Sequence, residues 1–347
     1  MLWPAPSRSL CGRVTLVPGE IEGVGMDSLV AERPVMADGE AAALQDLIGY
    51  LTRQAYRFIT PTPATHARVL ARPDRREAVD LRDIFGWSLP FAATLLDVSL
   101  LETLQAADLI EAAGDRLRSK VRVSTLGRDL LVHSAYPTDD THSVFFGPDS
   151  YRFARFIAEE LRRCPERPGA TLVDIGTGAG AGAIAAAHCC PKVDIVMTDI
   201  NPAALRFARV NARTAGITAR FVQGEDLSGI AGKLDLVLAN PPYIIDPAGR
   251  AYRDGGELHG AGVALAMACE AVPRLAAGGR FLLYTGSAIV RGKDTLRDRL
   301  LQLAAAEDCR MRYEEIDPDV FGEELETAAY ADVERIALVT AVIERAV

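Results

Sequence analysis

From residue 171 to the end of the chain, short apolar runs alternate with segments of helical periodicity, and this alternation restricts the possible folds more than any other feature. The expected strands cover residues 171–175, 193–198, 221–223, 234–239, 280–284, 311–316 and 336–343. Helices are expected at 180–189 and at 202–215, where Asn201 is a suitable N-cap and Pro202 a suitable first residue. Alternating strands and helices form a parallel, doubly wound sheet, so we predict an α/β fold with a seven-stranded, Rossmann-like sheet.

The region before this sheet has a different pattern, in which helical spacing comes first. Apolar residues recur at helical spacing in residues 39–59, with Asp38 as the expected N-cap, and again in residues 99–114. Ser99 and Glu102 have the spacing of a capping box at the start of the second stretch. We therefore expect a smaller, mainly helical domain ahead of the sheet.

Composition completes the expected domain organisation. The first 37 residues are rich in Pro and Gly and have no sustained periodicity, which is typical of a flexible segment. The predicted parts are a flexible segment at 1–37, a helical, winged-helix-like cap or substrate domain at 38–143, and a cofactor-binding catalytic domain at 144–347.

Residues 116–123 alternate in the manner of a half-buried strand. Four basic side chains are expected on one face of this strand: Arg116, Arg118, Lys120 and Arg122. Short helices followed by a basic strand are typical of winged-helix modules, in which the wing often contacts nucleic acid. A solvated edge strand has the same charges, because charge blocks unwanted strand pairing, and we favour this simpler interpretation.

Charge and composition restrict the classes of partner. The chain has 347 residues and a formal net charge of −9, which disfavours non-specific attraction to nucleic acid unless a local basic patch exists. No segment reaches the roughly 18 apolar residues of a membrane span, and the N-terminal region has no pattern of a secretion signal. The six cysteines lack metal-ligand spacing. We therefore expect a cytoplasmic protein without a membrane partner or a metal site.

A glycine-rich turn follows the first expected strand, in the run Asp174-Ile175-Gly176-Thr177-Gly178-Ala179-Gly180. Gly176 and Gly178 allow backbone geometry that larger residues avoid, so the ribose and amino-acid parts of a nucleoside cofactor can approach the main chain. Asp199 ends the second strand about 20 residues later, where a carboxylate can accept hydrogen bonds from both ribose hydroxyls. The alternatives are a tight turn without a ligand and, for Asp199, a helix cap.

Further residues are candidates for the same cofactor site. Asp174 can orient a cofactor ammonium or cap the glycine turn, and Asp226 can accept the adenine amino hydrogens or be an ordinary turn residue. The rings of Phe146 and Tyr151 can close over a cofactor or pack between the domains, and Asp149-Ser150 can cap a helix that begins at Tyr151. The full candidate set for the cofactor is Asp174, Gly176, Thr177, Gly178, Gly180, Asp199, Ile200, Glu225, Asp226, Asn240, Phe146 and Tyr151.

The tetrapeptide Asn240-Pro241-Pro242-Tyr243 closes the fourth expected strand. The side-chain carbonyl of Asn240 and the main-chain carbonyl of Pro241 can each accept a hydrogen bond from a nitrogen that carries two hydrogens. These bonds would aim the nitrogen lone pair at an electrophilic carbon and favour the positive charge that develops on nitrogen. Tyr243 supplies a ring on which a planar amide, guanidine or base can stack. Asn240, Pro241 and Tyr243 are therefore candidate catalytic residues, and a rigid strand-ending turn is the alternative.

The run from Val173 to Gly180, together with Asp199, Asp226 and the tetrapeptide, resembles the N-methyltransferase branch of the class I S-adenosylmethionine-dependent methyltransferases. The resemblance is closest to HemK-like enzymes, which methylate the side-chain amide of a glutamine in release factors. The run Tyr252-Arg253-Asp254-Gly255-Gly256 is also similar to two-domain bacterial methyltransferases of unassigned substrate. The resemblance covers roughly residues 144–345. It implies a class I methyltransferase fold and S-adenosylmethionine as the cofactor, whereas the N-terminal region departs from the HemK helical bundle.

Three functions are open at this point. The first is an N-methyltransferase that acts on an amide or amine of a protein side chain or of a small metabolite. The second is a nucleic-acid methyltransferase that acts on an exocyclic amine, and the third is a cyclase in which the α-amine of S-adenosylmethionine attacks its own γ-carbon, giving azetidine-2-carboxylate and methylthioadenosine. Residues 244–262 are expected to form a mobile binding loop that determines acceptor specificity, with His259 at the surface.

Overall fold

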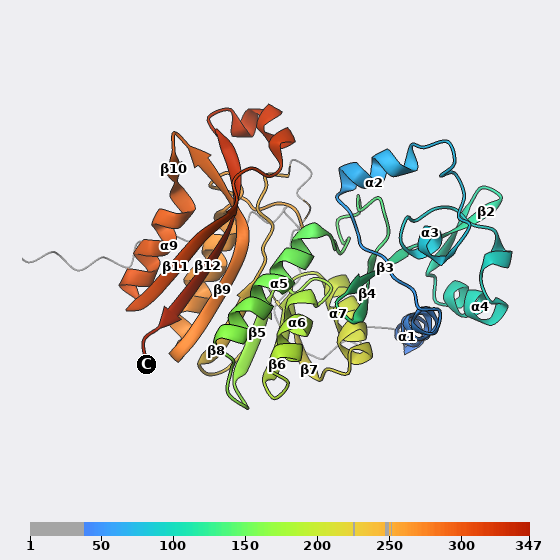
Figure 1. The fold of residues 1–347 in the computed structure, drawn as a ribbon. Coiled ribbons are helices and arrows are strands. Elements are labelled where there is room, and N and C mark those ends of the chain that lie inside the picture. The colour runs from blue at the N-terminus through green and yellow to red at the C-terminus, as the bar shows by residue number, and fades with distance from the viewer. Residues whose placement is uncertain (1–37, 225, 247–249, 251) are drawn as a thin grey trace, which may run out of the picture.

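The computed structural model describes residues 38–224, 226–246, 250 and 252–347. Its centre is a mixed sheet in the order β11-β12-β9-β8-β5-β6-β7, with the short strand β10 beside β9 (Figure 1). The strands are β5 (Thr171–Ile175), β6 (Asp194–Asp199), β7 (Ala219–Gln223), β8 (Leu234–Ala239), β9 (Leu275–Val290), β10 (Lys293–Asp294), β11 (Cys309–Asp317) and β12 (Arg335–Arg345). All seven predicted strands are present, and the predicted α/β, Rossmann-like sheet is confirmed.

The sheet is parallel from β9 to β7 and antiparallel at its other edge. β5 pairs in parallel with β6 and with β8, whereas β12 pairs antiparallel with both β9 and β11. The helices of this region are α5 (Pro148–Arg163), α6 (Ala181–Cys189), α7 (Pro202–Thr214), α8 (Gly262–Ala271) and α9 (Thr295–Ala306). Parallel strands end at the same edge of a sheet, and ligands bind at that edge in doubly wound folds. The glycine turn after β5 and the tetrapeptide after β8 therefore lie at the same edge.

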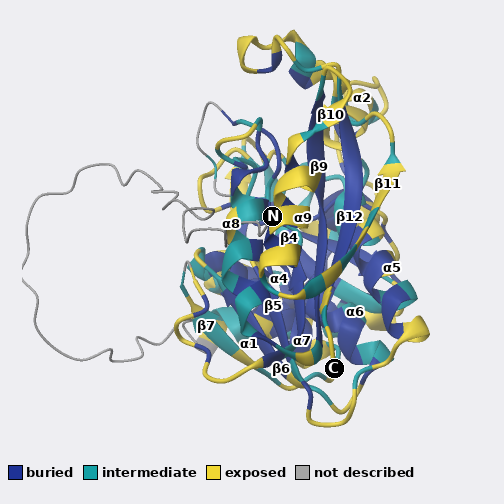
Figure 2. Cartoon of the chain, turned by 90° about the vertical axis from the view of Figure 1, so that its left-hand side faces the viewer, coloured by how far each residue is buried: buried dark blue, intermediate teal, exposed yellow. Residues whose placement is uncertain are grey.

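Helices cover both faces of the sheet. Leu172 and Leu236 belong to a core shared with α5, α6 and α7, whereas Val173 and Val237 belong to a core shared with α8 and α9. Neighbouring residues face opposite cores because side chains alternate along a strand. All four side chains are 0% exposed. Both faces are therefore sealed, as parallel strands require, and Figure 2 shows the central strands in the colour of buried residues.

The N-terminal part lies beside α7 (Figure 1). Its elements are α1 (Asp38–Arg53), α2 (Pro63–Leu70), α3 (Leu81–Phe85), η1 (Ala93–Leu95), α4 (Val98–Ala106), β1 (Ile110–Ala113), β2 (Arg116–Ser119), β3 (Val121–Leu126) and β4 (Asp129–Ser134). Strands β1 and β2 form one antiparallel hairpin, and β3 and β4 form another. Among the residues that the structure describes, no helix has the length and apolarity needed to cross a membrane.

The second predicted helix, at residues 99–114, differs from the structure at both ends. Its cap is Asp97, whose carboxylate accepts hydrogen bonds from the N–H groups of Ser99 and Leu100, so the prediction of Ser99 as the cap is wrong. The helix ends at Ala106, and β1 follows within the predicted helical range. Aspartate and serine are both good N-caps, and the residue directly before the first helical turn takes the role.

The basic strand predicted at residues 116–123 is two strands. The strand is interrupted at Lys120, which lies between β2 and β3. The alternation of side chains therefore does not continue across the whole segment. Arg116 and Lys120 each pair with a carboxylate, and Arg122 lies in the core with 4% of its surface exposed. The predicted common basic face is therefore wrong, because Arg122 is not part of it, whereas the nucleic-acid wing and the solvated edge stay predictions for the other basic residues.

Asn211 of α7 connects the second hairpin to the glycine turn. Its side chain is 1% exposed. The Oδ1 atom accepts a hydrogen bond from Val132 N (2.8 Å), and Nδ2 donates to Val132 O and Ala179 O (both 2.9 Å). Val132 lies in β4 and Ala179 lies in the glycine turn, so one buried amide holds the N-terminal part against the ligand-binding edge of the sheet.

We predict that Asn211→Ala lowers the free energy of unfolding by about 2–4 kcal/mol, because it leaves buried main-chain groups of Val132 and Ala179 without partners. Urea denaturation followed by circular dichroism measures the change. Arg213→Ala, at an exposed position two residues further along α7, is the control and should change the free energy by less than about 0.5 kcal/mol. Equal effects of the two substitutions would contradict the assignment.

Candidate active site

The glycine turn forms an open cradle at the carboxyl end of β5. Gly176, Gly178 and Gly180 have φ angles of 65°, 54° and 84°, in the left-handed region that favours glycine. A Cβ atom added to Gly178 would meet no atom within 4 Å, so the main chain is open to a ligand at this point. Thr177 N donates to Thr198 O (2.9 Å), which fixes the turn to the end of β6.

Asp174 supports the turn from beneath and is 2% exposed. Its Oδ2 atom accepts hydrogen bonds from Thr177 Oγ1 (2.7 Å) and Ala183 N (3.0 Å). Burial raises the pKa of this carboxyl group to about 6. The structure therefore shows the capping role considered for Asp174, and a contact with a cofactor ammonium stays a prediction.

Asp199, at the end of β6, holds the glycine turn from the side. Its carboxylate accepts hydrogen bonds from Gly178 N (2.9 Å) and Asn201 N (2.8 Å), and burial raises its pKa. The helix-cap alternative for Asp199 is wrong, because the Asn201 side chain caps α7 by accepting from Ala203 N (2.9 Å). The adjacent Ile200 leaves 46% of its surface exposed and offers an apolar surface next to this carboxylate.

Asp226 is exposed in the turn after β7. Its Oδ1 atom accepts hydrogen bonds from Ser228 Oγ (2.6 Å) and Ser228 N (3.0 Å), and the bond from the hydroxyl holds its pKa below the ordinary value. These are the bonds of an ordinary turn aspartate, and a contact with adenine stays a prediction. Glu225 lies outside the described residues.

The tetrapeptide stands beside the glycine turn because β8 and β5 are parallel neighbours. Ala239 at the end of β8 pairs with Ile175 at the end of β5, so Asn240 and Gly176 leave the sheet side by side. Asn240 is half-buried, and its side-chain amide makes no hydrogen bond within the described part of the chain. Most buried polar side chains in folded proteins have a partner. The half-buried Asn240 amide differs in this respect, and its contact with a ligand stays a prediction.

Tyr243 is held by a carboxylate from a distant helix. Its hydroxyl donates to Asp149 Oδ2 (2.8 Å), and the hydroxyl of Tyr284 in β9 donates to Asp149 Oδ1 (2.8 Å). Burial, followed by the nearby Asp149 charge, raises the pKa of Tyr243. The predicted helix start at Tyr151 with an Asp149-Ser150 cap is wrong, because α5 begins at Pro148 and Asp149 lies in its first turn. Sequence reasoning placed Asp149 in a local role and missed this contact.

The ring of Tyr243 is not an open stacking surface. Only 7% of the residue is exposed. The ring packs on the backbone of Gly286, where an added Cβ would come within 2.2 Å of it, and it meets Phe321 edge to face at 5.6 Å between ring centroids. The expected stacking of an acceptor on this ring is therefore wrong, and the structure gives Tyr243 a supporting position beneath the tetrapeptide.

Phe146 and Tyr151 lie between the N-terminal part and α5. Phe146 is 1% exposed, stacks on His133 of β4 and meets Tyr151 edge to face. The Tyr151 hydroxyl accepts a hydrogen bond from Thr60 N (3.1 Å). These contacts show the interdomain packing that was one of the two interpretations, and closure over a cofactor stays a prediction.

The described part of the loop at 244–262 is anchored on two sides. The Tyr252 hydroxyl donates to Thr138 O (2.6 Å), in the segment that joins the N-terminal part to α5. On the other side, Arg253 forms an ion pair with Glu324. Residues 247–249 and 251 lie outside the described residues. The described part of this loop therefore contacts the protein on both sides of the tetrapeptide.

Comparisons with known proteins identify the family. A family model described as "Methyltransferase small domain" matches residues 153–307. The release factor glutamine methyltransferase of Deinococcus radiodurans is 30% identical over 255 residues, which cover 69% of this chain and 84% of that protein. The enzyme of the same name from Bradyrhizobium diazoefficiens is 33% identical over 247 residues, covering 66% of this chain and 82% of that protein.

Among solved structures, Trm5b from Pyrococcus abyssi aligns with a TM-score of 0.47 and 14% identity, covering 69% of this chain and 62% of that chain. The sheet, the glycine turn, the tetrapeptide and the two bacterial relatives agree with one another. The chain therefore belongs to the HemK-like branch of the class I methyltransferases and is an S-adenosylmethionine-dependent methyltransferase.

Proposed function

We propose that this enzyme methylates the side-chain amide nitrogen of a glutamine in a protein, and that a release factor is the first acceptor to test. The observation that carries the proposal is the half-buried Asn240 amide without a hydrogen-bond partner among the described residues. A primary amide nitrogen carries two hydrogens, which match the Asn240 side-chain carbonyl and the Pro241 main-chain carbonyl. The names of the two bacterial relatives support a glutamine as the acceptor.

The residues around the glycine turn fit S-adenosylmethionine, which supplies a methyl carbon attached to a positively charged sulfur when it is bound. Gly178 offers open main chain, and the Asp199 carboxylate beside it can accept ribose hydroxyls. Ile200 offers apolar surface to the adenine ring, and Asp226 is the proposed acceptor of the adenine amino hydrogens. The proposed cofactor site further includes Asp174, Gly176, Thr177, Gly180, Glu225, Asn240, Phe146 and Tyr151.

In the proposed reaction, Asn240 Oδ1 and Pro241 O accept the two amide hydrogens and aim the nitrogen lone pair at the methyl carbon. The new N–C bond forms as the C–S bond breaks, and one proton leaves the nitrogen for solvent. The two carbonyl oxygens favour the positive charge that develops on nitrogen, so positioning and electrostatics provide the acceleration. Asp149 acts as a positioning residue, because it holds Tyr243 at the end of the tetrapeptide.

We also propose that residues 38–143 form a cap that faces the acceptor and that residues 144–347 form the catalytic domain. The flexible segment expected at 1–37 lies outside the described residues. The ring of Tyr252, in the loop at 244–262, stacks with Phe145 at 6.0 Å between centroids, and its hydroxyl donates a hydrogen bond to Thr138 O. The N-terminal part thus borders the loop that follows the tetrapeptide. A location in the cytoplasm stays a prediction.

Methylation of a purified release factor tests the proposed acceptor. The enzyme is incubated with S-adenosylmethionine and the release factor, and peptide mass mapping is expected to show one added methyl group on a glutamine. S-adenosylhomocysteine should form only when the acceptor is present. Methylthioadenosine formed without an acceptor would instead indicate the cyclase reaction, and methylated RNA in place of the protein would indicate a nucleic-acid acceptor.

Asn240→Ala is expected to lower turnover by about 100- to 1,000-fold, because one of the two oxygens that orient the nitrogen is removed. Isothermal titration calorimetry should still detect binding of S-adenosylmethionine to this variant, since the glycine turn is untouched. Turnover at the wild-type rate would remove Asn240 from the mechanism.

Asp199→Asn is expected to weaken S-adenosylmethionine binding by about 10- to 100-fold, because the amide keeps only one oxygen for the turn and the ribose. Asp194→Asn, at the exposed start of the same strand, is the matched control and should bind like the wild type. Calorimetric titration of both variants with S-adenosylmethionine measures the two dissociation constants. Unchanged affinity in Asp199→Asn would exclude Asp199 from the cofactor site.

A further inference from the structure

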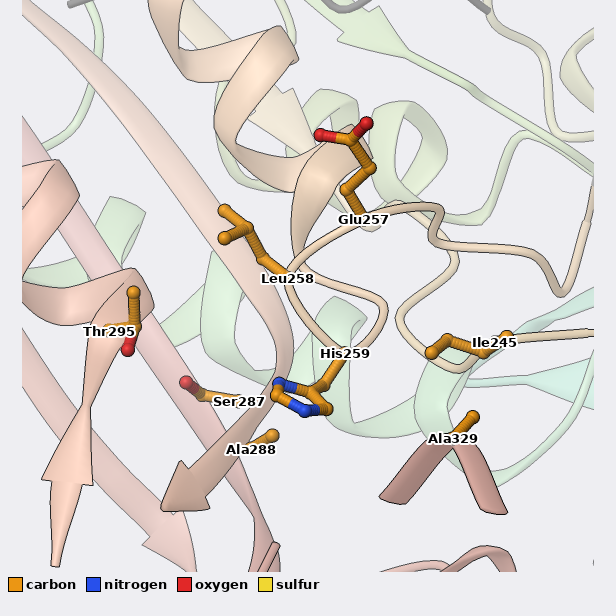
Figure 3. Close-up of a pocket in the computed structure, with 8 residues that line it drawn as sticks. All are labelled: Ile245, Glu257, Leu258, His259, Ser287, Ala288, Thr295 and Ala329. Carbon is orange, nitrogen blue, oxygen red and sulfur yellow. The ribbon is translucent and has the colours of Figure 1, made fainter. Parts of the chain in front are cut away.

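A cavity of about 500 Å³ lies next to the segment that follows the tetrapeptide (Figure 3). Its walls come from that segment, from the turn before α8, from the end of β9, from the start of α9 and from the short helix η4 (Ala328–Tyr330). Pockets of about 300–1,000 Å³ are the size that encloses drug-sized ligands, so this one has room for a short stretch of peptide.

The cavity shares a wall with the tetrapeptide. Ile245 lines it and follows Tyr243 by two residues. Ser287 lines it from β9 and follows Gly286, on whose backbone the Tyr243 ring packs. The glycine turn lies on the other side, because β8 separates β9 from β5 in the sheet. The cavity is therefore on the side of the tetrapeptide away from the cofactor cradle, where the rest of an acceptor must lie.

One wall of the cavity is held in an unusual backbone conformation. Leu258 and His259 have φ angles of 57° and 53°, in a region that non-glycine residues seldom adopt. Two contacts hold this turn in place: His259 Nε2 pairs with Asp332 Oδ1 (3.0 Å), and the Tyr330 hydroxyl donates to His259 O (3.3 Å). Such conformations persist where the surrounding structure enforces them, and they concentrate at binding sites.

The chemistry of the lining is apolar with one free charge at the rim. Ile245, Leu258 and Ala329 present apolar surface, and 36% of Leu258 is exposed. Glu257 is exposed, and within the described part of the chain its carboxylate has no hydrogen-bond or ion-pair partner. The His259 imidazole pairs with Asp332 and therefore does not neutralise the Glu257 carboxylate. The lining therefore suits an apolar group with a positive charge beside it.

We propose that this cavity binds the segment of the protein acceptor that flanks the methylated residue, with an apolar side chain inside it and a basic side chain at Glu257. The inference rests on the proposed function, because it requires a polypeptide acceptor. Asn240 precedes Ile245 by five residues, and an extended chain advances about 3.3 Å per residue. The bound segment therefore lies within about five residues of the methylated side chain.

Two substitutions test the cavity, each with a neighbouring control. Ala329→Phe fills it from an exposed position in η4, and Ala328→Phe adds the same ring at an exposed neighbour that does not line it. Glu257→Lys reverses the rim charge, and Glu326→Lys reverses an exposed charge that does not line the cavity. The measurement is steady-state methylation of the purified release factor, with calorimetric titration of S-adenosylmethionine on every variant.

Ala329→Phe and Glu257→Lys are expected to raise the KM for the protein acceptor about tenfold or more, with kcat and the cofactor dissociation constant near wild type. The two controls should stay within about twofold of the wild-type KM. The effect of Glu257→Lys should shrink as salt is added, since it acts through charge. Methylation with the same KM for all four variants would overturn the cavity assignment alone. Absence of methylation by the wild type would overturn the proposed function and this occupant together.

Discussion

The parallel pairing of β5 with β8 is the constraint on which the rest of this structure depends. It places Ile175 beside Ala239 and therefore brings the glycine turn and the tetrapeptide to the same edge of the sheet. The register is specified by the two cores, because a shift by one residue would turn Val173 and Val237 out of the core that they share with α8 and α9. Hydrophobic burial on both faces thus determines the distance between the tetrapeptide and the glycine turn.

Two carboxylates then fix the orientation of these segments. Asp199 accepts a hydrogen bond from Gly178 N, and Asp149 accepts one from Tyr243 and another from Tyr284. Asp199 also accepts a hydrogen bond from Asn201 N, and Asp149 accepts a third from Arg152. These hydrogen bonds offset the cost of removing the two charges from water. These contacts are made within the protein itself, so the cradle and the tetrapeptide are arranged before a ligand arrives. Preorganisation of this kind suits a reaction that depends on positioning.

The sheet could be predicted because its signals are local. Apolar runs mark the strands, and Asn201 with Pro202 marks the start of α7 as the structure has it. The predictions that failed depend on contacts between distant parts of the chain or on competition between neighbours. Asp149 lies 94 residues before Tyr243, and no nearby residue indicates that contact. Arg122 is buried in β3, which begins after the interruption at Lys120. The alternation of residue types in the sequence does not reveal this interruption.

The same distinction applies to the candidate site. The glycine turn and Asn240 are recognisable from spacing and residue type, because main-chain geometry and an amide at a strand end have direct chemical meaning. The buried position of Tyr243 depends on Gly286 and Phe321, which come from two other segments of the fold. The cavity beyond the tetrapeptide is likewise assembled from five separate segments.

A crystal structure with S-adenosylhomocysteine and a glutamine-containing acceptor peptide tests the central claim most directly. The account predicts that Asn240 Oδ1 and Pro241 O both lie within hydrogen-bond distance of the glutamine amide nitrogen, with that nitrogen directed at the sulfur of the nucleoside. A glutamine bound elsewhere, or a tetrapeptide that faces away from the nucleoside, would contradict it.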